Sequence, residues 1–501
     1  MNHKRVGCTP SRDWRSAGAG PGGIAARWPT QQCLDLPQQH TRFTPHHTEK
    51  EPHALPWQEH VAACSGTEAI AWPAGCLGQF PDPGKAEVRF SRIRHYRGFS
   101  SLKTLRISCV MGTRPEIIKL APVITALQKV PRVSVSVILT GQHRELAEQA
   151  LKVLRVPIDR DLELMRTGQS PVEVAAGILQ GLGREWRVRS PSAVLVQGDT
   201  TSAMVAGLTA FYNRIPVGHV EAGLRTGDLE APYPEELNRK VIATFARWNF
   251  APTKRAMRNL LREGVSPARV YVTGNTIVDA LHSARRRIAS MSPSALRSLR
   301  KEIAPQNRDL LRQLSGNLKR KLVVVTLHRR ESFGAPLRNM LQALRQIAFR
   351  LPETLIVFPV HPNPNVQAPV RECLEGLGNV ACVAPLPYLP FVWLLGQARV
   401  VITDSGGIQE ECAVLGKPTL VTRKVTERPE AIEGGSARLV GTDPEALVRQ
   451  TIRLVRDDLL YAQMTRSSRM FGDGRAGMRI ARILLRSLEG GSDIHLTAGE
   501  E

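Results

Sequence analysis

Three acidic residues stand where they could move protons to and from a carbon atom. Asp199 follows an apolar run at residues 193–196, Glu221 follows another at 215–220, and Glu235 opens a helical pattern. Where carboxylates share one site, burial and mutual repulsion push their pKa values apart, which separates an acid from a base. Each residue alone could instead be a helix cap or a surface ion-pair partner, and Asp199 precedes two threonines as a cap would. That simpler interpretation weakens when all three lie on one side of a sheet.

A second group of residues has the character of a phosphate seat. An apolar run at 400–402 leads through Ser-Gly-Gly at 405–407 into a helical pattern. The first N–H groups of a helix lack internal partners, the helix dipole makes that end positive, and glycines let an anion approach the backbone. Glu411 could accept hydrogen bonds from ribose hydroxyls, and Arg428 could add positive charge beside a diphosphate. Taken alone, this stretch is more often an ordinary turn between a strand and a helix.

Basic side chains follow two further apolar runs. Arg114 comes after the run at 105–111, with Lys119 in the helix that follows, and the two could point at one anion. A solvent-facing position is the alternative for both. His328 follows the run at 321–326, and its ring could donate to a departing phosphate oxygen.

The elements that must position these groups alternate between strand and helix, and the alternation restarts after a helical segment at 275–314. The runs typical of strands lie at 105–111, 133–139, 193–196, 215–220, 270–273, 321–326, 354–360, 380–383, 400–402 and 419–421. This pattern predicts an α/β fold with two Rossmann-like, doubly wound domains. Ligands of such sheets bind beyond the carboxyl ends of the strands, so two domains facing across a cleft would place the ligand between them.

We expect two domains flanked by segments of different character. Residues 103–275 form the N-terminal Rossmann-like domain, and residues 276–470 form the C-terminal domain that binds the anion. A helix within 471–490 is expected to pack back on the first domain, and 491–501 form a tail. Residues 1–102 are rich in Pro, Gly, His and Gln without a sustained amphipathic period, which predicts a disordered basic extension.

The composition narrows the classes of partner. A formal net charge of +23 over 501 residues attracts nucleic acid, acidic surfaces or small anions. The basic residues are scattered and not interleaved with aromatic ones, so we expect a small anion and no nucleic acid. The sequence contains no Cys-x-x-Cys pair and no other spacing typical of metal ligands. It also contains no run of 18 apolar residues, the length needed to span a membrane. Cys109 and Cys412 read as core residues of a cytoplasmic protein.

Short motifs that contain these residues occur in one order along the chain. They are GTRPEIIKLAPV, TGQHRE, QGDTTSA, PVGHVEAGLRTGD, PYPEELNR, HRRESFG, PVHPNPNV, YLPFVWLL, DSGGIQEE and TERPEA. Each motif alone is weak, but in this order they make residues 104–488 similar to the non-hydrolysing UDP-N-acetylglucosamine 2-epimerases of bacteria. The resemblance implies a glycosyltransferase-B-like fold without NAD or metal. It also implies interconversion of UDP-N-acetylglucosamine (UDP-GlcNAc) and UDP-N-acetylmannosamine (UDP-ManNAc) for surface polysaccharide.

The resemblance further implies roles for single residues. In this family the C2 proton of the sugar and UDP leave to give 2-acetamidoglucal, and UDP then adds back while a proton returns to the other face. Carried over by motif, the catalytic residues are Asp199, Glu221, Glu235, Arg239 and His328. The residues that hold the substrate and UDP are Arg114, Lys119, Asp199, Glu221, His328, Phe391, Ser405, Gly406, Gly407, Glu411 and Arg428.

Two positions depart from the family pattern, and one motif contains a residue that could take part in regulation. Gln197 stands where a histidine often precedes Gly-Asp. Leu386 and Pro387 stand where a Gln-containing pair often contacts the base, which could weaken uracil binding. Gln142 falls in the motif that contributes to a second, activating UDP-GlcNAc site in some family members, so regulation stays open.

Three other functions compete with this interpretation. A hydrolysing relative would release N-acetylmannosamine and UDP by the same elimination. A glycosyltransferase of similar fold would keep the UDP seat without needing the three carboxylates, and an inactive sensor would not need them either. For assembly, we expect a homodimer, because two-fold pairs are the commonest soluble oligomers.

Overall fold

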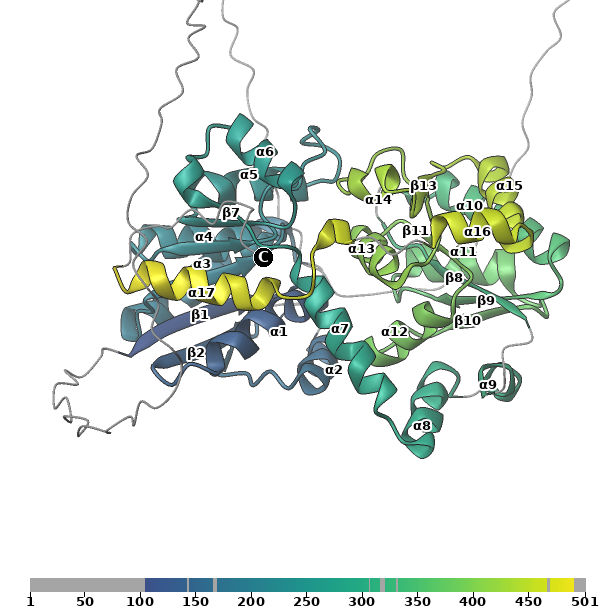
Figure 1. The fold of residues 1–501 in the computed structure, drawn as a ribbon, viewed down its shortest axis with the longest axis horizontal. Helices are drawn as coiled ribbons and strands as arrows, with labels where there is room; N and C mark the ends of the chain where they lie inside the picture. The colour runs from purple at the N-terminus through teal and green to yellow at the C-terminus, as the bar shows by residue number, and fades with distance from the viewer. Residues whose placement is uncertain are drawn as a thin grey trace, which may run out of the picture. The chain divides into compact units, whose positions relative to one another are not determined.

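The computed structural model describes residues 104–490 except for 142–143, 165–168, 306, 316–319, 330–331 and 466–468 (Figure 1). The expected extension at 1–102, the tail at 491–501 and the regulatory residue Gln142 lie outside the described residues. No helix in the described part combines the length and apolar character needed to cross a membrane.

The first half of the described chain folds into a parallel sheet of strand order β3-β2-β1-β4-β5-β6-β7. Its strands are β1 (Leu105–Met111), β2 (Val133–Leu139), β3 (Arg160–Asp161), β4 (Ala193–Gln197), β5 (Val217–Val220), β6 (Trp248–Ala251) and β7 (Val270–Val272). Its helices are α1 (Arg114–Gln128), α2 (Arg144–Leu154), α3 (Pro171–Val188), α4 (Thr201–Tyr212), α5 (Glu235–Phe245) and α6 (Lys254–Arg262), with a 3-10 turn η1 (Pro267–Arg269). The strand order reverses between β1 and β4, which is where doubly wound sheets bind ligands.

The second half repeats this topology, with strand order β10-β9-β8-β11-β12-β13. Its strands are β8 (Lys321–Thr326), β9 (Thr354–Pro359), β10 (Val380–Val383), β11 (Val400–Thr403), β12 (Thr419–Val421) and β13 (Ala437–Leu439). Its helices are α7 (Thr276–Ala289), α8 (Pro293–Ile303), α9 (Arg308–Ser315), α10 (Ala335–Arg350), α11 (Pro364–Leu374), α12 (Tyr388–Gln397), α13 (Gly406–Leu415), α14 (Pro429–Glu433), α15 (Pro444–Arg456) and α16 (Asp458–Met464), followed by a 3-10 turn η3 (Arg469–Phe471). The reversal lies between β8 and β11, so the expected pair of doubly wound domains is confirmed.

Helices cover both faces of the first sheet, which explains its continuous apolar strands. Along β1, Cys109 and Met111 lie in one buried cluster with residues of α1, and Val110 between them lies in another with residues of α3 and α4. Successive side chains of a strand point to opposite faces, so a strand that is covered on both sides needs apolar residues at every position. Both faces of the first sheet are therefore packed against helices.

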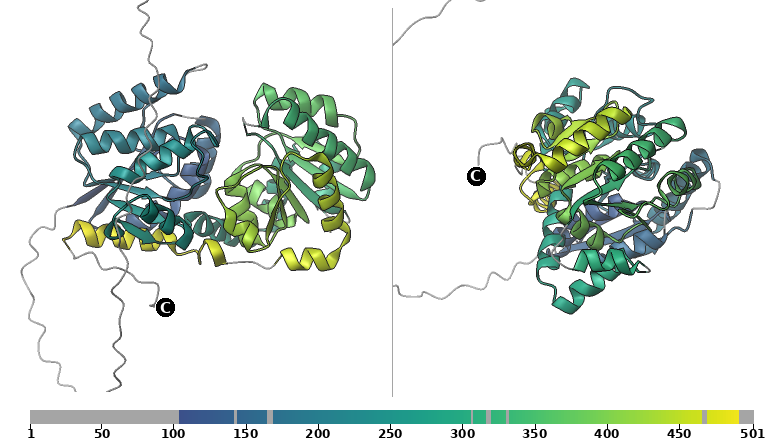
Figure 2. Two further views of the ribbon diagram at one scale, coloured as in Figure 1. Left: turned by 90° about the horizontal axis from the view of Figure 1, so that it is seen from above. Right: turned by 90° about the vertical axis from the view of Figure 1, so that its right-hand side faces the viewer.

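Two connections link the halves. After β7, Ile277 and Leu281 of α7 enter the buried cluster of the second half. The chain returns through η3 into α17 (Ala476–Leu488), whose Ile480 and Leu484 pack with Leu120 of α1. The final helix thus lies against the first half and contacts α1, and Figures 1 and 2 show this yellow helix beside the blue and teal half.

Several elements differ from the sequence-based expectations. The strands β3, β6 and β13 were not predicted, because a run as short as Trp248–Ala251 carries no readable alternation. The helical segment at 275–314 is three helices, α7, α8 and α9. A helix is expected over residues 117–130, but α1 begins at Arg114, because Thr113 and Glu116 form a capping box around its first turn.

Candidate active site

Both sheets present polar side chains at the carboxyl ends of the strands beside their reversal points. Asp199 follows β4 and Glu221 follows β5 in the first sheet. His328 follows β8 and Ser405 follows β11 in the second. The two halves touch through these ends, because a side chain of α1 forms an ion pair with a side chain of α13. The expected site residues therefore come from both halves.

Asp199 is fixed by side chains of α5. The guanidinium of Arg239 forms an ion pair with Asp199 and also donates from Nη1 to Glu236 at 2.9 Å. Asn238 Nδ2 donates to the main-chain oxygen of Asp199 at 2.8 Å. Glu236 is fully buried and accepts backbone N–H groups from the loop after β5. Helix α5 thereby sets Asp199 against the loop that begins with Glu221.

The environments of Asp199 and Glu235 drive their pKa values in opposite directions. Burial alone would raise the pKa of Asp199, but the Arg239 guanidinium outweighs it and holds that pKa below its ordinary value. Burial raises the pKa of Glu235, and the negative charge of Asp199 raises it further. Within the described part of the chain, Glu235 Oε2 is buried and has no hydrogen-bond partner. The pair therefore joins an ionised carboxylate to one that holds a proton more readily.

Glu221 is held by its neighbours in an unusual backbone conformation. Its φ of 69° lies in the left-handed region, which costs a residue other than glycine about 1–3 kcal/mol. Its backbone N–H donates to Phe250 O at 3.1 Å, which fixes the turn. Its carboxylate contacts Lys119, Asn275 and Arg428. This convergence aims the carboxylate at the boundary between the halves.

Lys119 bridges the two halves. Its ammonium forms an ion pair with Glu221 and lies 3.2 Å from Glu410 Oε2 of α13. Burial alone would lower the pKa of Lys119, but the charge of Glu221 outweighs it and the pKa lies above its ordinary value. Lys119 is therefore a buried cation that holds two carboxylates of different halves together.

Arg428 is buried among carboxylates. Its Nε donates to Glu410 at 2.9 Å, its Nη1 contacts Glu427, and its Nη2 lies 3.4 Å from Glu221 Oε1 in the other half. Burial alone would lower the pKa of Arg428, but Glu410 and Glu427 outweigh it and raise the pKa. A diphosphate at this place would compete with these carboxylates for the guanidinium.

His328 is oriented by a buried aspartate. Asp404 Oδ2 accepts the backbone N–H groups of His328 and Arg329 at 2.7 and 2.8 Å, and Asp404 Oδ1 lies 3.1 Å from His328 Nδ1. Burial alone would raise the pKa of Asp404, but His328 outweighs it and the pKa is lowered. Because an ionised carboxylate only accepts, a hydrogen bond between these two atoms requires the hydrogen on Nδ1. The imidazole stacks on His361 with ring centroids 5.7 Å apart, and it is 37% exposed, so its Nε2 edge can meet a ligand.

The residues expected to hold the nucleoside form a further group. Arg114 Nη1 donates to Leu386 O at 2.8 Å and lies near the charge of Glu411. Burial raises the pKa of Glu411 to about 7. Phe391 is 7% exposed and belongs, with Tyr388, to the buried cluster of the second half. The backbone oxygen of Leu386, rather than a glutamine side chain, is thus the polar group that this segment offers.

The start of α13 has the open backbone that an anion needs. Ser405 is the N-cap residue, and its side chain makes no cap hydrogen bond. A Cβ atom at Gly406 would lie 2.4 Å from Arg428 Nη1, so only glycine lets that guanidinium pack on the helix start. A Cβ atom at Gly407 would meet no described atom within 4 Å. The helix start is therefore open beside Gly407, and beside Gly406 it meets the guanidinium of Arg428 together with the carboxylate of Glu427.

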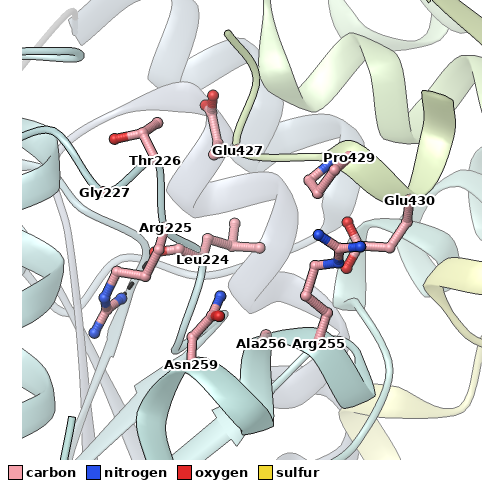
Figure 3. A pocket seen from close by; sticks show the side chains of 10 residues that line it. All are labelled: Leu224, Arg225, Thr226, Gly227, Arg255, Ala256, Asn259, Glu427, Pro429 and Glu430. Carbon is pink, nitrogen blue, oxygen red and sulfur yellow. Dashed lines mark hydrogen bonds between the residues drawn. The ribbon is translucent and has the colours of Figure 1, made fainter. Parts of the chain in front are cut away.

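A pocket of about 250 Å³ opens between the halves beside these groups (Figure 3). It is lined by Leu224, Arg225, Thr226, Gly227, Arg255, Ala256 and Asn259 of the first half and by Glu427, Pro429 and Glu430 of the second. Near it, Thr253 Oγ1 donates to Glu430 at 2.7 Å, and Arg255 forms an ion pair with Glu433. The halves therefore meet across a cleft, with direct contacts along its edge.

Several site residues were not singled out from the sequence. They are Glu236, Asn275, Asp404, Glu410 and Glu427. Four of them lie in motifs that were noted for a neighbouring residue. The sequence therefore indicated the segment in which they lie, but not the side chains that they contact. Among the described residues, no group of three His, Cys, Asp or Glu side chains could hold a metal ion.

The fold and site together define an enzyme of glycosyltransferase-B-like architecture, in which two doubly wound domains meet at a helix start with an open backbone and a set of carboxylates. A family model described as UDP-N-acetylglucosamine 2-epimerase matches residues 125–485. The chain belongs to this family of isomerases.

Individual relatives agree with this assignment. The UDP-N-acetylglucosamine 2-epimerase of Salmonella typhimurium is 46% identical over 380 residues, covering 76% of this chain and 98% of that protein. The crystal structure of UDP-GlcNAc 2-epimerase from Neisseria meningitidis bound to UDP-GlcNAc matches with a TM-score of 0.72 and 38% identity, over 76% of this chain and 100% of that one. The Methanocaldococcus jannaschii enzyme in complex with UDP-GlcNAc and UDP matches with a TM-score of 0.65 and 30% identity, over 76% and 99%.

Proposed function

We propose that the protein interconverts UDP-GlcNAc and UDP-ManNAc without hydrolysis. The observation that carries this proposal is the contact between Glu221 and Arg428. Glu221 belongs to the half that also holds Asp199 and Glu235, and Arg428 belongs to the half that holds the open helix start. One sugar could then lose a carbon-bound proton to the first half and its diphosphate to the second.

The reaction divides into an elimination and its reversal. A carboxylate removes the proton from C2, the C1–O bond breaks, and UDP leaves with the bonding electrons, so that 2-acetamidoglucal remains. UDP then adds back at C1 while a carboxylic acid returns a proton to the opposite face of C2. Since the C2 proton is only weakly acidic, a positioned base and a stabilised leaving group must share the work.

The pKa directions assign the first roles. Asp199, which Arg239 keeps ionised, is the base in one direction, and Glu235, which holds its proton more readily, is the acid. The two exchange roles in the reverse direction. The Glu221 carboxylate lies beside the cations of Lys119 and Arg428. We therefore assign it to contact with the sugar near C2 rather than to proton exchange with solvent.

The second half supports the leaving group. When both ring nitrogens carry a hydrogen, His328 can donate from Nε2 to a phosphate oxygen while Nδ1 faces Asp404. The first N–H groups of α13, at Gly406 and Gly407, and the hydroxyl of Ser405, which makes no cap hydrogen bond, suit the same diphosphate.

The remaining expected substrate residues lie on α1 of the first half and on α12 and α13 of the second half. Glu411 and Arg114 are assigned to the nucleoside, with Phe391 behind the base. Lys119 takes an indirect part, because it holds Glu221.

Proton NMR in heavy water tests the proposal. The full chain, incubated with UDP-GlcNAc, is expected to yield UDP-ManNAc with deuterium at C2, because the proton removed from carbon exchanges before another returns. A product that keeps its C2 proton would contradict the mechanism. Free N-acetylmannosamine as the main product would favour the hydrolysing reaction, and transfer of the sugar to an acceptor would favour a glycosyltransferase.

We further infer a cytoplasmic homodimer whose UDP-ManNAc supplies surface polysaccharide. Cys109 and Cys412 are free and buried, in keeping with a reducing compartment. The neighbouring helices α3 and α4 leave Val188 81% and Tyr212 68% exposed, which offers an apolar surface to a second copy.

Light scattering tests this surface. The full chain is expected at twice its 55.2 kDa mass, and the V188E/Y212E variant at one chain mass, because two carboxylates would be buried without partners. V172E, on the exposed start of α3, serves as a comparison for added charge. A wild-type protein of one chain mass at micromolar concentration would contradict the dimer.

A further inference from the structure

The two connections between the halves are fixed to each other where they cross. The backbone N–H of Asn275, which follows β7, donates to Phe471 O of the returning connection at 2.7 Å. A Cβ atom built on Gly472 would lie 3.0 Å from the Cα of Gly274, so the two connecting segments are in direct backbone contact. Any rotation of one half against the other must pass through this crossing.

The side chain of Asn275 extends from this crossing to the proposed site. Its Oδ1 accepts the backbone N–H of Ile277 at 3.1 Å and so caps α7. Its Nδ2 donates to Glu221 Oε2 at 3.0 Å. Asn275 is 2% exposed, so both ends of its amide are committed to these partners without competing solvent. One residue thus joins the crossing, the start of α7 and a carboxylate of the site.

We propose that Asn275 is a positioning residue that fixes the carboxylate of Glu221 and ties its orientation to the crossing between the halves. This inference rests on the proposed epimerase function. Lys119 and Arg428 attract Glu221 by charge, but a charge attracts from many directions. A planar amide donor defines one direction, and the strained φ of 69° at Glu221 makes its aim sensitive to what holds it.

The simpler alternative is that Asn275 only caps a helix. Serine and aspartate cap as well as asparagine does, so Asn275→Ser and Asn275→Asp keep the cap and remove the donor to Glu221. Asp443→Ser is the matched control, because Asp443 caps α15 through the N–H groups of Glu445 and Ala446.

The experiment measures kcat, KM, UDP affinity and melting temperature for the full chain and these variants. Asn275→Ser is expected to lower kcat by about 10-fold to 10²-fold, since a misplacement of about 1 Å can have that effect. UDP affinity is expected to change less than about 2-fold, because Asn275 faces the carboxylate and not the diphosphate seat. Melting temperature is expected to fall further than in Asp443→Ser, because Asn275 is buried and Asp443 is exposed, so kcat is compared at a temperature where both variants are folded.

The pH profile separates positioning from packing. Asn275→Asp places a second carboxylate against Glu221. The other charged neighbours of Glu221 are Lys119 and Arg428, and both of these cations also pair with Glu410. Since two adjacent carboxylates resist joint ionisation, the acid limb of kcat is expected to move to higher pH in this variant and not in Asn275→Ser.

The outcomes distinguish this inference from the proposed function. Wild-type protein that neither epimerises nor exchanges C2 deuterium removes the function itself. Wild-type kcat in Asn275→Ser, or a crystal structure of that variant with Glu221 in its present rotamer, overturns the positioning role whatever the reaction proves to be.

Discussion

Replacing Asp199 by asparagine is expected to lower kcat for the interconversion by at least about 10²-fold, the usual contribution of a positioned acid or base. The amide of asparagine cannot take a proton from C2. Arg239 and Asn238 would still hold the residue in place, so geometry is preserved while basicity is lost. Initial rates in both directions, followed by NMR with saturating substrate, measure the effect.

The control separates chemistry from a broken ion pair. Asp458 pairs with Arg399, which precedes the amino end of β11 and so lies at the end opposite Ser405, and Asp458→Asn is expected to leave kcat unchanged. UDP binding to Asp199→Asn is expected to stay within about 3-fold of wild type, because the variant keeps the seat on α13. Near-normal turnover in Asp199→Asn would remove this residue from the mechanism.

The positions of the carboxylates could be predicted because they depend on a general property of parallel sheets. Asp199 and Glu221 follow strands that were recognised from their apolar runs, and such strands end at one edge of the sheet. The motif order then assigned the family. Neither step required knowledge of any contact.

The partners of these residues could not be predicted. Arg428 was expected to be available to a diphosphate, yet it contacts Glu221, Glu410 and Glu427. Glu410 precedes the noted Glu411 by one position, and one step along a helix turns a side chain by about 100°. Both carboxylates are buried, and the sequence pattern does not show which of the two faces Arg428.

Asn275 shows the same limit over a longer range. Its cap of α7 is a local feature that a sequence can suggest, but its bond to Glu221 joins positions 54 residues apart. That contact depends on how β7, α7 and the returning connection cross, which is set by the packing of whole domains. Short strands such as β6 were missed for a related reason, since tertiary pairing and not local pattern makes them strands.

Replacing Arg428 by methionine is expected to destabilise the protein by roughly 3–5 kcal/mol, because it leaves buried carboxylates with too little positive charge. Glu410 is fully buried and would keep only Lys119, at 3.2 Å. Glu427 would keep Arg423, at 2.6 Å. Denaturant unfolding, with wild type and Glu410→Gln alongside, measures the loss.

The double variant R428M/E410Q separates the structural role of this arginine from its binding role. Burial raises the pKa of Glu410 even beside Arg428, so a neutral glutamine suits the site once the arginine is gone, and part of the lost stability is expected to return. UDP affinity is not expected to return. It should stay about 10-fold to 10²-fold weaker than in Glu410→Gln, which is the range of a charge-assisted hydrogen bond. Titration calorimetry decides the question: a double variant that binds UDP as tightly as Glu410→Gln would mean that Arg428 holds the two halves together and leaves the diphosphate to His328 and the start of α13.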